Sequence, residues 1–263
     1  MRFIQSKREA YWFYRFVSPL YDRWINPLFW TPPMRSRALA LARLDHHDLR
    51  TLDVGAGTGF STEGIVERVD PRHVTMLDQS PAQLDRARRK PALAASAKLL
   101  GDAERLPFET DSFDRYVSCG SIEYWPDPLA AVTEAYRVLR PGGIALIVGP
   151  LPPAKRLARL LADIWMLFPA ETQYHGWLRQ AGFEDIEALH LAAPWQDGAG
   201  APFGLAIAGR KPRAGTSPAA SRASVPRDAS APVRVVRFVL GSLAGAAFVP
   251  VGVVLNRRAR RAR

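Results

Sequence analysis

The stretch Leu52-Asp53-Val54-Gly55-Ala56-Gly57-Thr58-Gly59-Phe60 indicates how this chain folds. It continues a β-like run at Thr51–Val54 and opens a helical pattern over 61–69, so its glycines lie in a turn between a strand and a helix. Glycines in such a turn let the backbone approach a bound ligand closely. The turn alone is compatible with a dinucleotide, a nucleoside or no ligand.

The spacing of these glycines argues against a dinucleotide. The dinucleotide fingerprint needs a small residue at its third glycine position, where this chain has Phe60. The glycines alternate instead at 55, 57 and 59. A nicotinamide-dependent oxidoreductase is therefore an alternative that Phe60 opposes and that measurable NAD binding would support.

Two carboxylates follow the next two expected strands. Asp78 comes nineteen residues after Gly59, and Asp102 follows Gly101. A carboxylate at 78 can accept both hydroxyls of a ribose diol, and one at 102 can accept the exocyclic amine of adenine. The backbone N–H of Ala103 can donate to an adenine ring nitrogen. Each aspartate taken alone could be only a helix cap, but together they predict a nucleoside site.

The order of the expected elements predicts an α/β fold with a mostly parallel sheet and helices on both faces. Expected strands cover Thr51–Val54, 74–77, 98–100, 115–118, 144–148 and 204–208. Expected helices cover 61–69, 81–90, 127–139, 154–168 and 172–181.

Charge divides the chain near residue 210. The net charge is +11, yet residues 1–209 hold 24 Lys and Arg against 24 Asp and Glu. Residues 210–263 hold 12 basic residues and one acid, Asp228. We therefore expect no nucleic-acid face on the domain. A basic tail beside an apolar segment is typical of contact with anionic lipid headgroups.

Composition predicts four regions: an aromatic, helical lid over 1–48, a nucleoside-binding domain over 49–210, a flexible linker over 211–233, and a membrane anchor over 234–263. Residues 238–255 carry no charge over 18 positions, which as a helix would reach about 27 Å. A C-terminal membrane helix is expected. Membrane association is favoured over a soluble packed helix, while the choice between a spanning helix and a re-entrant hairpin stays open.

Other site types find little support. Cys119 is the only cysteine, and the five histidines show no ligand-like spacing, so neither a disulfide nor a metal site is expected. No continuous apolar run follows Met1, so no secretory signal is expected. The expected location is the cytoplasmic face of a membrane.

The combined order of motifs resembles class I S-adenosylmethionine (SAM)-dependent methyltransferases. The resemblance runs from the glycine turn through Asp78 and Asp102 to Phe113-Asp114-Arg115-Tyr116-Val117-Ser118 and Leu139-Arg140-Pro141-Gly142-Gly143. It implies SAM as cofactor, with Ser118, Cys119 and Gly120 at the methionine end and Asp53 orienting the turn or the ammonium group through water. The implied SAM-binding set is Asp53, Gly55, Gly57, Gly59, Asp78, Gln79, Asp102, Ala103, Ser118 and Cys119.

A closer resemblance concerns enzymes that methylate quinone rings. Tyr14-Arg15-Phe16-Val17-Ser18-Pro19-Leu20-Tyr21-Asp22 is similar to C-methyltransferases of ubiquinone and menaquinone synthesis. Three further stretches resemble the 2-methyl-6-phytyl-1,4-hydroquinone methyltransferases: Leu77-Asp78-Gln79-Ser80-Pro81, Gly120-Ser121-Ile122-Glu123-Tyr124-Trp125-Pro126, and Asp163-Ile164-Trp165-Met166-Leu167. The resemblance covers about residues 7–210. It implies methylation of the ring of a membrane-resident prenylated hydroquinone, with a C-terminal membrane segment.

That reaction suits a dry pocket and a base. Aromatic side chains could exclude water and contact the sulfonium, although core packing explains any one of them. The expected pocket residues are Trp12, Tyr14, Tyr21, Tyr124, Trp125 and Trp165. Glu123 is the first candidate for the base and His175 the second, while Cys119 is expected to line the pocket rather than to act as a nucleophile.

Two further readings share the SAM site. The acceptor could be another membrane-associated molecule, such as a menaquinone precursor, a lipid or a phenol. The chain could instead be a non-catalytic SAM-binding membrane protein, which would bind SAM without forming its demethylated product. Assays with labelled SAM and a panel of acceptors separate these readings.

Overall fold

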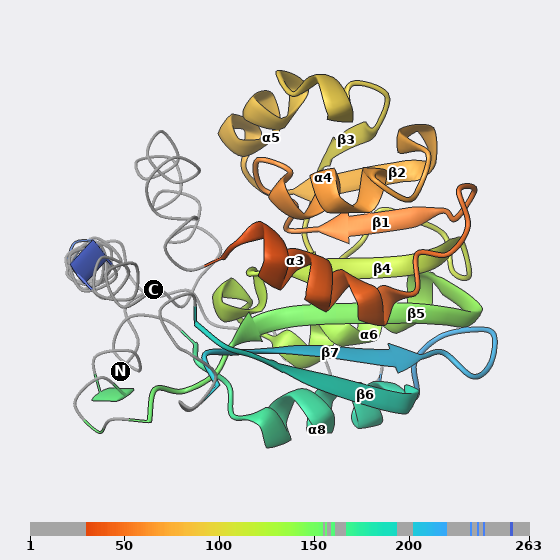
Figure 1. Ribbon diagram of the computed structural model, residues 1–263. Helices are drawn as coiled ribbons and strands as arrows, with labels where there is room; N and C mark the ends of the chain where they lie inside the picture. Colours follow the sequence, from red (N-terminus) through yellow and green to blue (C-terminus); the bar gives the residue numbers. More distant parts are fainter. Residues whose placement is uncertain are drawn as a thin grey trace.

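A computed structural model describes residues 30–154, 167–193 and 202–219, and the separate positions 156, 159, 160, 232, 236, 239, 253 and 254. One seven-stranded sheet has the order β3-β2-β1-β4-β5-β7-β6 (Figure 1). The strands are β1 Thr51–Val54, β2 Val74–Asp78, β3 Ala97–Leu100, β4 Phe113–Cys119, β5 Leu139–Pro150, β6 Glu184–Leu191 and β7 Gly204–Arg210. All neighbours pair in parallel except β7, which runs antiparallel to both β5 and β6.

Helices cover both faces of the sheet (Figure 1). One face packs against α3 (Pro32–Leu39), α4 (Phe60–Val66) and α5 (Pro81–Arg88); the other packs against α6 (Pro128–Val138) and α8 (Glu171–Ala181). Short 3₁₀ turns lie at η2 Ala40–Ala42, η3 Pro71–His73, η4 Pro91–Leu93 and η5 Ile122–Tyr124. This is the Rossmann-like arrangement that the alternating elements predict.

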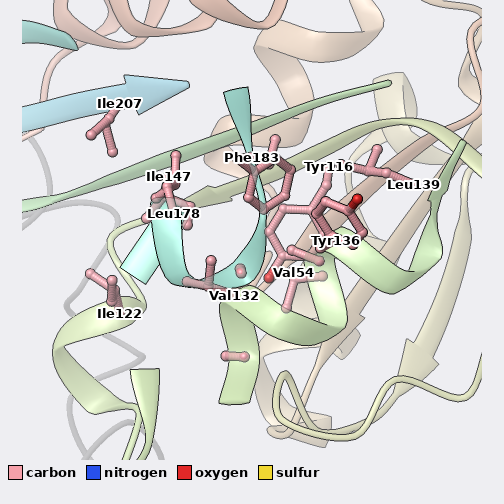
Figure 2. Close-up of a cluster of buried hydrophobic side chains, with 14 of the residues drawn as sticks. Val54, Tyr116, Ile122, Val132, Tyr136, Leu139, Ile147, Leu178, Phe183 and Ile207 are labelled. Atoms are coloured by element: carbon pink, nitrogen blue, oxygen red, sulfur yellow. The ribbon is translucent and has the colours of Figure 1, made fainter. Parts of the chain in front are cut away.

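The larger core lies between the sheet and helices α6 and α8. Val54 from β1 and Tyr116 from β4 face Val132 and Tyr136 of α6 (Figure 2). The rings of Tyr136 and Phe183 meet edge to face with centroids 5.2 Å apart. This packing fixes the strands whose carboxyl ends carry the loops of the site.

Local chemistry sets the ends of the covering helices. The Asp127 side chain accepts a hydrogen bond from the Ala130 N–H at 3.1 Å, and Pro128 occupies the first helical position, so α6 begins there. Helix α8 ends at Gly182, whose φ of 97° lies in the left-handed region that glycine favours.

All six expected strands are confirmed, with bounds extended by one to seven residues where they differ. The expected helices at 61–69, 81–90, 127–139 and 172–181 correspond to α4, α5, α6 and α8. The helix expected at 154–168 falls mostly outside the described residues: positions 156, 159 and 160 are helical, whereas 167 and 168 are not. Strand β6 was not expected, because its exposed charges hide a β pattern.

The prediction that the flexible linker begins at residue 211 is wrong. Lys211 is fully buried, and its Nζ donates to Asp111 Oδ1 at 2.5 Å and to the Gly215 carbonyl at 2.7 Å. The same ammonium lies 4.7 Å from the centre of the Tyr136 ring. A buried lysine is tolerated when it has such partners. Residues 211–219 therefore pack against the domain, although their composition, rich in proline and small residues, favours a flexible linker.

Two expected regions lie largely beyond the described part of the chain. Residues 1–29 of the expected lid are outside it, whereas α3 packs on the domain. The expected membrane helix within 234–263 is represented by only four positions. In the portion that is described, no helix combines the length and apolarity needed to cross a membrane.

Candidate active site

A cavity of about 230 Å³ lies at the carboxyl ends of the parallel strands. Loops after β1, β2, β3 and β4 form its walls, together with the adjoining ends of β5, β6 and β7. Many residues expected at the site line this cavity: Gly55, Gly57, Asp78, Gln79, Asp102, Ala103, Cys119, Glu123, Tyr124 and Trp125. The structure thus brings together segments that are far apart in sequence.

The turn after β1 is shaped by glycine. Gly55 and Gly57 have φ angles of 68° and 56°, which side chains rarely tolerate. A Cβ at 55 would overlap the side chain of Ser121, whereas one at 57 would meet nothing within 4 Å. The turn therefore packs against the loop after β4 at Gly55 and leaves open space at Gly57.

Asp78 joins the turn to the end of β2. Its Oδ2 accepts the Gly57 N–H and its Oδ1 accepts the Ser80 N–H, both at 2.8 Å. Burial raises the pKa of this carboxyl, and hydrogen bonds from the backbone of Ser80, Gly57 and Gln79 oppose that rise. Since a carboxylate has about four acceptor sites, it can still accept a hydroxyl group of a ligand.

Asp53 lies beneath the turn rather than in the cavity wall. It is fully buried, and its Oδ2 accepts the Thr62 hydroxyl at 2.6 Å. Its Oδ1 has no hydrogen-bond partner among the described residues. Burial raises its pKa to about 7; the Thr62 hydrogen bond opposes this rise and the charge of Asp78 adds to it. A buried carboxylate with an unused oxygen favours a cationic group nearby.

Asp102 and Ala103 form a tight turn after β3. Asp102 Oδ1 accepts the Glu104 N–H at 2.9 Å, and its carbonyl accepts the Arg105 N–H at 3.1 Å. Both residues line the cavity together with Gly101. A planar base at this position would meet the backbone of the turn and the carboxylate from one side.

The end of β4 and the loop after it line the cavity. Ser118 is fully buried behind the wall, and its hydroxyl lies 2.7 Å from that of Ser121. Cys119 lines the wall, and burial raises the pKa of its thiol, so the uncharged form is favoured. This supports the expectation that Cys119 lines the pocket.

Glu123 follows in η5 and also lines the cavity. Its Oε2 is buried without a hydrogen-bond partner in the described part of the chain. Burial raises the pKa of this carboxyl to about 7. The geometry therefore offers one carboxyl in the cavity wall that changes charge near neutral pH.

Several expected residues lie elsewhere. His175 is on α8, does not line the described cavity, and has its Nε2 3.8 Å from Glu171 Oε1, so the second candidate base gains no support. Gly59 does not line the cavity either; a Cβ there would overlap Leu93. Trp12, Tyr14, Tyr21 and Trp165 fall outside the described residues.

Other lining residues were missed from the sequence. Ser80 and Gln83 are buried, and Ser80 Oγ and Gln83 Oε1 have no partner among the described residues. Ser80 could have been predicted, because Ser80-Pro81 is a typical helix start directly after the strand that carries Asp78. Apolar lining residues from distant segments gave no motif: Trp30, Met34, Phe60, Leu191 and Phe203.

Comparison with known proteins gives consistent findings. A family model described as a methyltransferase domain matches residues 52–147. The chain is 50% identical over 261 residues to the chloroplastic 2-methyl-6-phytyl-1,4-hydroquinone methyltransferase 2 of Oryza sativa subsp. japonica, covering 97% of this chain and 75% of the relative. It is 48% identical to the corresponding Arabidopsis thaliana protein, covering 97% and 77%. A demethylmenaquinone methyltransferase of Staphylococcus aureus is 31% identical, covering 68% and 79%.

Solved structures share the fold at low identity. The [4+2]-cyclase SpnF superposes with a TM-score of 0.62 at 19% identity, covering 79% of this chain and 97% of that one. Phosphoethanolamine N-methyltransferase 2 of Haemonchus contortus, solved with SAM, gives 0.58 at 18% identity, covering 70% and 54%. Because the first of these is a cyclase, the fold alone does not determine the chemistry.

Proposed function

The chain belongs to the family of 2-methyl-6-phytyl-1,4-hydroquinone methyltransferases, and from that premise we propose that it methylates a ring carbon of a prenylated hydroquinone. It is a SAM-dependent methyltransferase with a Rossmann-like class I fold. One observation carries the proposal: the glycine turn, two carboxylates and Glu123 surround a single cavity in a chain half identical to these enzymes over nearly its full length.

The residues present fit SAM. When bound, SAM supplies an electrophilic methyl group, whose bond to sulfur breaks as a bond to the ring carbon forms. Asp78 would accept the ribose hydroxyls, while Asp102 and the Ala103 N–H would hold the adenine. Buried Asp53 lies below the turn with an unused Oδ1, and its ionised form would favour a cationic donor.

Glu123 is the proposed base. A hydroquinone hydroxyl has a pKa near that of tyrosine, about 10, so a base assists its ionisation. Burial brings the pKa of Glu123 to about 7, closer to the phenol than an exposed carboxyl would be. The carboxylate would take the hydroxyl proton and raise the electron density of the ring carbons beside it. The hydrogen on the methylated carbon then leaves as a proton.

The surroundings of Glu123 limit access of water. Trp125 is buried and Tyr124 partly buried, and both line the cavity beside it. A cationic donor and an anionic ring lose charge as they approach each other, so a dry site favours the transition state. The proposed aromatic lid, with Trp12, Tyr14 and Tyr21, and the separate residue Trp165 would complete this shielding.

An acceptor panel tests the proposal. The purified full chain is incubated with methyl-labelled SAM and 2-methyl-6-phytyl-1,4-hydroquinone, reduced demethylmenaquinone, phosphatidylethanolamine or a tail-free phenol. We expect label in the prenylated hydroquinone. Label chiefly in the naphthalene ring would favour the demethylmenaquinone reaction of the 31% identical relative. If SAM binds but no acceptor is labelled, the proposal is contradicted and a non-catalytic SAM-binding membrane protein is favoured.

Residues 234–263 are the proposed contact with lipid. Val236, Val239 and Val254 are 56%, 48% and 48% exposed, and five arginines lie in 257–263. Exposed apolar side chains beside arginines favour an anionic membrane surface. This would bring the domain to a bilayer that contains the prenylated acceptor. Flotation of the full chain with anionic but not neutral vesicles is expected; no flotation with either would contradict the anchor.

A further inference from the structure

The cavity has two chemically different ends. The nucleoside end consists of Gly55, Gly57, Asp78, Asp102 and Ala103. The apolar end consists of Trp30, Met34, Phe60, Leu191 and Phe203. No charged group belongs to the second set, whose only side-chain hydrogen-bond donor is the Trp30 indole. Proposed SAM contacts account for the first end and leave the second without a ligand.

We infer that the apolar end binds the first isoprenoid units of the acceptor's tail. The inference rests on the proposed function and assigns a separate part of the same cavity. It goes beyond that function by naming the residues that would select a tailed acceptor over a tail-free ring.

The order of strands supports this assignment. Nucleoside-end residues follow β1, β2 and β3, Glu123 follows β4, and two of the apolar-end residues, Leu191 and Phe203, adjoin β6 and β7. In the sheet order β3-β2-β1-β4-β5-β7-β6 (Figure 1), strand β4, which leads to the proposed base, lies between β1 and the pair β7 and β6. A ring held at Glu123 with its reacting carbon toward the donor leaves the far side of the ring facing β5, β7 and β6.

Backbone hydrogen bonds hold one wall of the apolar end in place. The Phe203 N–H donates to the Leu191 carbonyl at 2.9 Å, and the Leu151 N–H donates to the Phe203 carbonyl at 3.0 Å. Leu191 is only 1% exposed and belongs to the core beneath α3. These bonds fix the backbone of the wall at Leu191 and Phe203, and a fixed backbone lowers the cost of binding.

The opposite wall comes from α3 and α4. The rings of Trp30 and Phe60 meet edge to face with centroids 6.4 Å apart. The Arg35 guanidinium holds the two helices together, because it donates to the Phe60 carbonyl at 2.9 Å and to Glu67 Oε1 at 2.8 Å. Met34 is 7% exposed beneath them. Aromatic and thioether surfaces of this kind suit a branched hydrocarbon.

Hydrocarbon is the chemistry that this end would recognise. Each CH₂ group moved from water to an apolar surface strengthens binding about fourfold. A ribose or a charged methionine end would instead leave polar groups unpaired here, which is costly. We therefore expect affinity to rise with each of the first isoprenoid units and then to level off.

Two variants and one control variant test the inference. All are assayed in the same detergent, so that the solubility of the acceptors stays the same. Phe203→Glu places a charge in the apolar end, and Trp30→Ala removes one of its walls; both residues are partly exposed, so folding should survive. Leu100→Glu changes a residue that is 57% exposed on edge strand β3 and serves as the control. KM is measured for acceptors with four, one and no isoprenoid units, and the Kd of SAM by calorimetry.

For Phe203→Glu we expect KM to rise at least tenfold for the four-unit acceptor and less than twofold for the tail-free ring, with the Kd of SAM unchanged. Trp30→Ala should give the same pattern more weakly, and Leu100→Glu none. Equal factors for tailed and tail-free acceptors, or a wild-type KM independent of tail length, would overturn the inference.

Binding without turnover separates this inference from the proposed function. The probe is an unreactive phytyl hydroquinone dimethyl ether, followed through quenching of tryptophan fluorescence. Weaker binding of the ether to Phe203→Glu than to the wild type supports the tail site even if no acceptor is methylated. Unchanged binding rejects the tail site even if methylation of the hydroquinone proceeds.

Discussion

The nucleoside end of the cavity depends on backbone geometry, whereas the apolar end depends on side chains from distant segments. At the first end, Gly55 and Gly57 adopt positive φ angles and Asp78 accepts a backbone N–H of the turn. At the second, Trp30 and Phe203 are 173 positions apart in the sequence yet line one cavity. One substitution in the turn can therefore weaken SAM binding at the whole nucleoside end. At the apolar end, each substitution should remove only part of the affinity for the tail.

Glu123→Gln tests the point where the ends meet and should have the largest effect. We expect kcat to fall about 100-fold, because a positioned base contributes 10²–10⁴. The wild-type rate should rise with pH through about 7 as the carboxyl ionises, and the variant should lose this rise. Rates across pH 5.5–9 with saturating substrates are the measurement. Near-normal turnover of the variant would remove Glu123 from the reaction.

Asp78→Asn tests the nucleoside end by removing the negative charge of one carboxylate. We expect SAM to bind about 30-fold more weakly, because a neutral amide replaces a carboxylate that would accept two hydroxyls. Calorimetry with SAM gives the result, and Asp85→Asn, on exposed α5 surface, is the matched control. A tailed hydroquinone ether should bind the variant as it binds the wild type. Weaker binding of both ligands would show that the two ends are not independent.

Gly55→Ala tests the nucleoside end by shape. The methyl group would overlap Ser121 and force a φ of 68° on alanine, so we expect SAM affinity to fall about tenfold and stability by about 1–3 kcal/mol. Thermal unfolding and calorimetry measure the two effects. At Gly57, where a Cβ meets nothing within 4 Å, alanine should cost less stability. Equal losses at both positions would contradict the role of the Ser121 contact.

A last expected effect, which changes stability and not binding or turnover, is the dependence of the free energy of unfolding on pH. The folded-state pKa of Glu123 is raised to about 7, so the unfolded chain ionises this carboxyl first and the folded state loses stability as pH rises from about 4.5 to 7. Glu123→Gln should therefore gain stability over the wild type across that range, by at most about 3 kcal/mol. Melting temperatures of both proteins at pH 5 and pH 8 provide the test. A constant difference would mean that the carboxyl is not buried.

The sequence predicted which residues of the nucleoside end line one cavity, because each motif is a short contiguous stretch. The turn at 52–60 and the aspartates after β2 and β3 are short motifs whose chemistry is local. The apolar end was missed because Trp30, Leu191 and Phe203 meet only after β6 and β7 pair in antiparallel fashion. Strand β6 itself was missed, since exposed residues such as Glu184, Asp185 and Glu187 obscure its alternation. His175 was proposed on residue type alone, and the fold places it away from the cavity wall.

The buried Lys211 determines where the rest of the chain starts. Because β7 runs antiparallel to β5, Arg210 lies beside Ile144, at the end of the sheet remote from cavity residue Pro150. From Ile144 to Pro150, strand β5 covers six residue steps, or about 20 Å. Fully extended, the 18 residues 220–237 would reach about 60 Å, more than this return along the domain requires. Removing about fourteen of them would leave a reach of about 13 Å, too short for the cavity to face a bilayer that holds the tail. Turnover of vesicle-embedded acceptor would then fall, while turnover in detergent would not change.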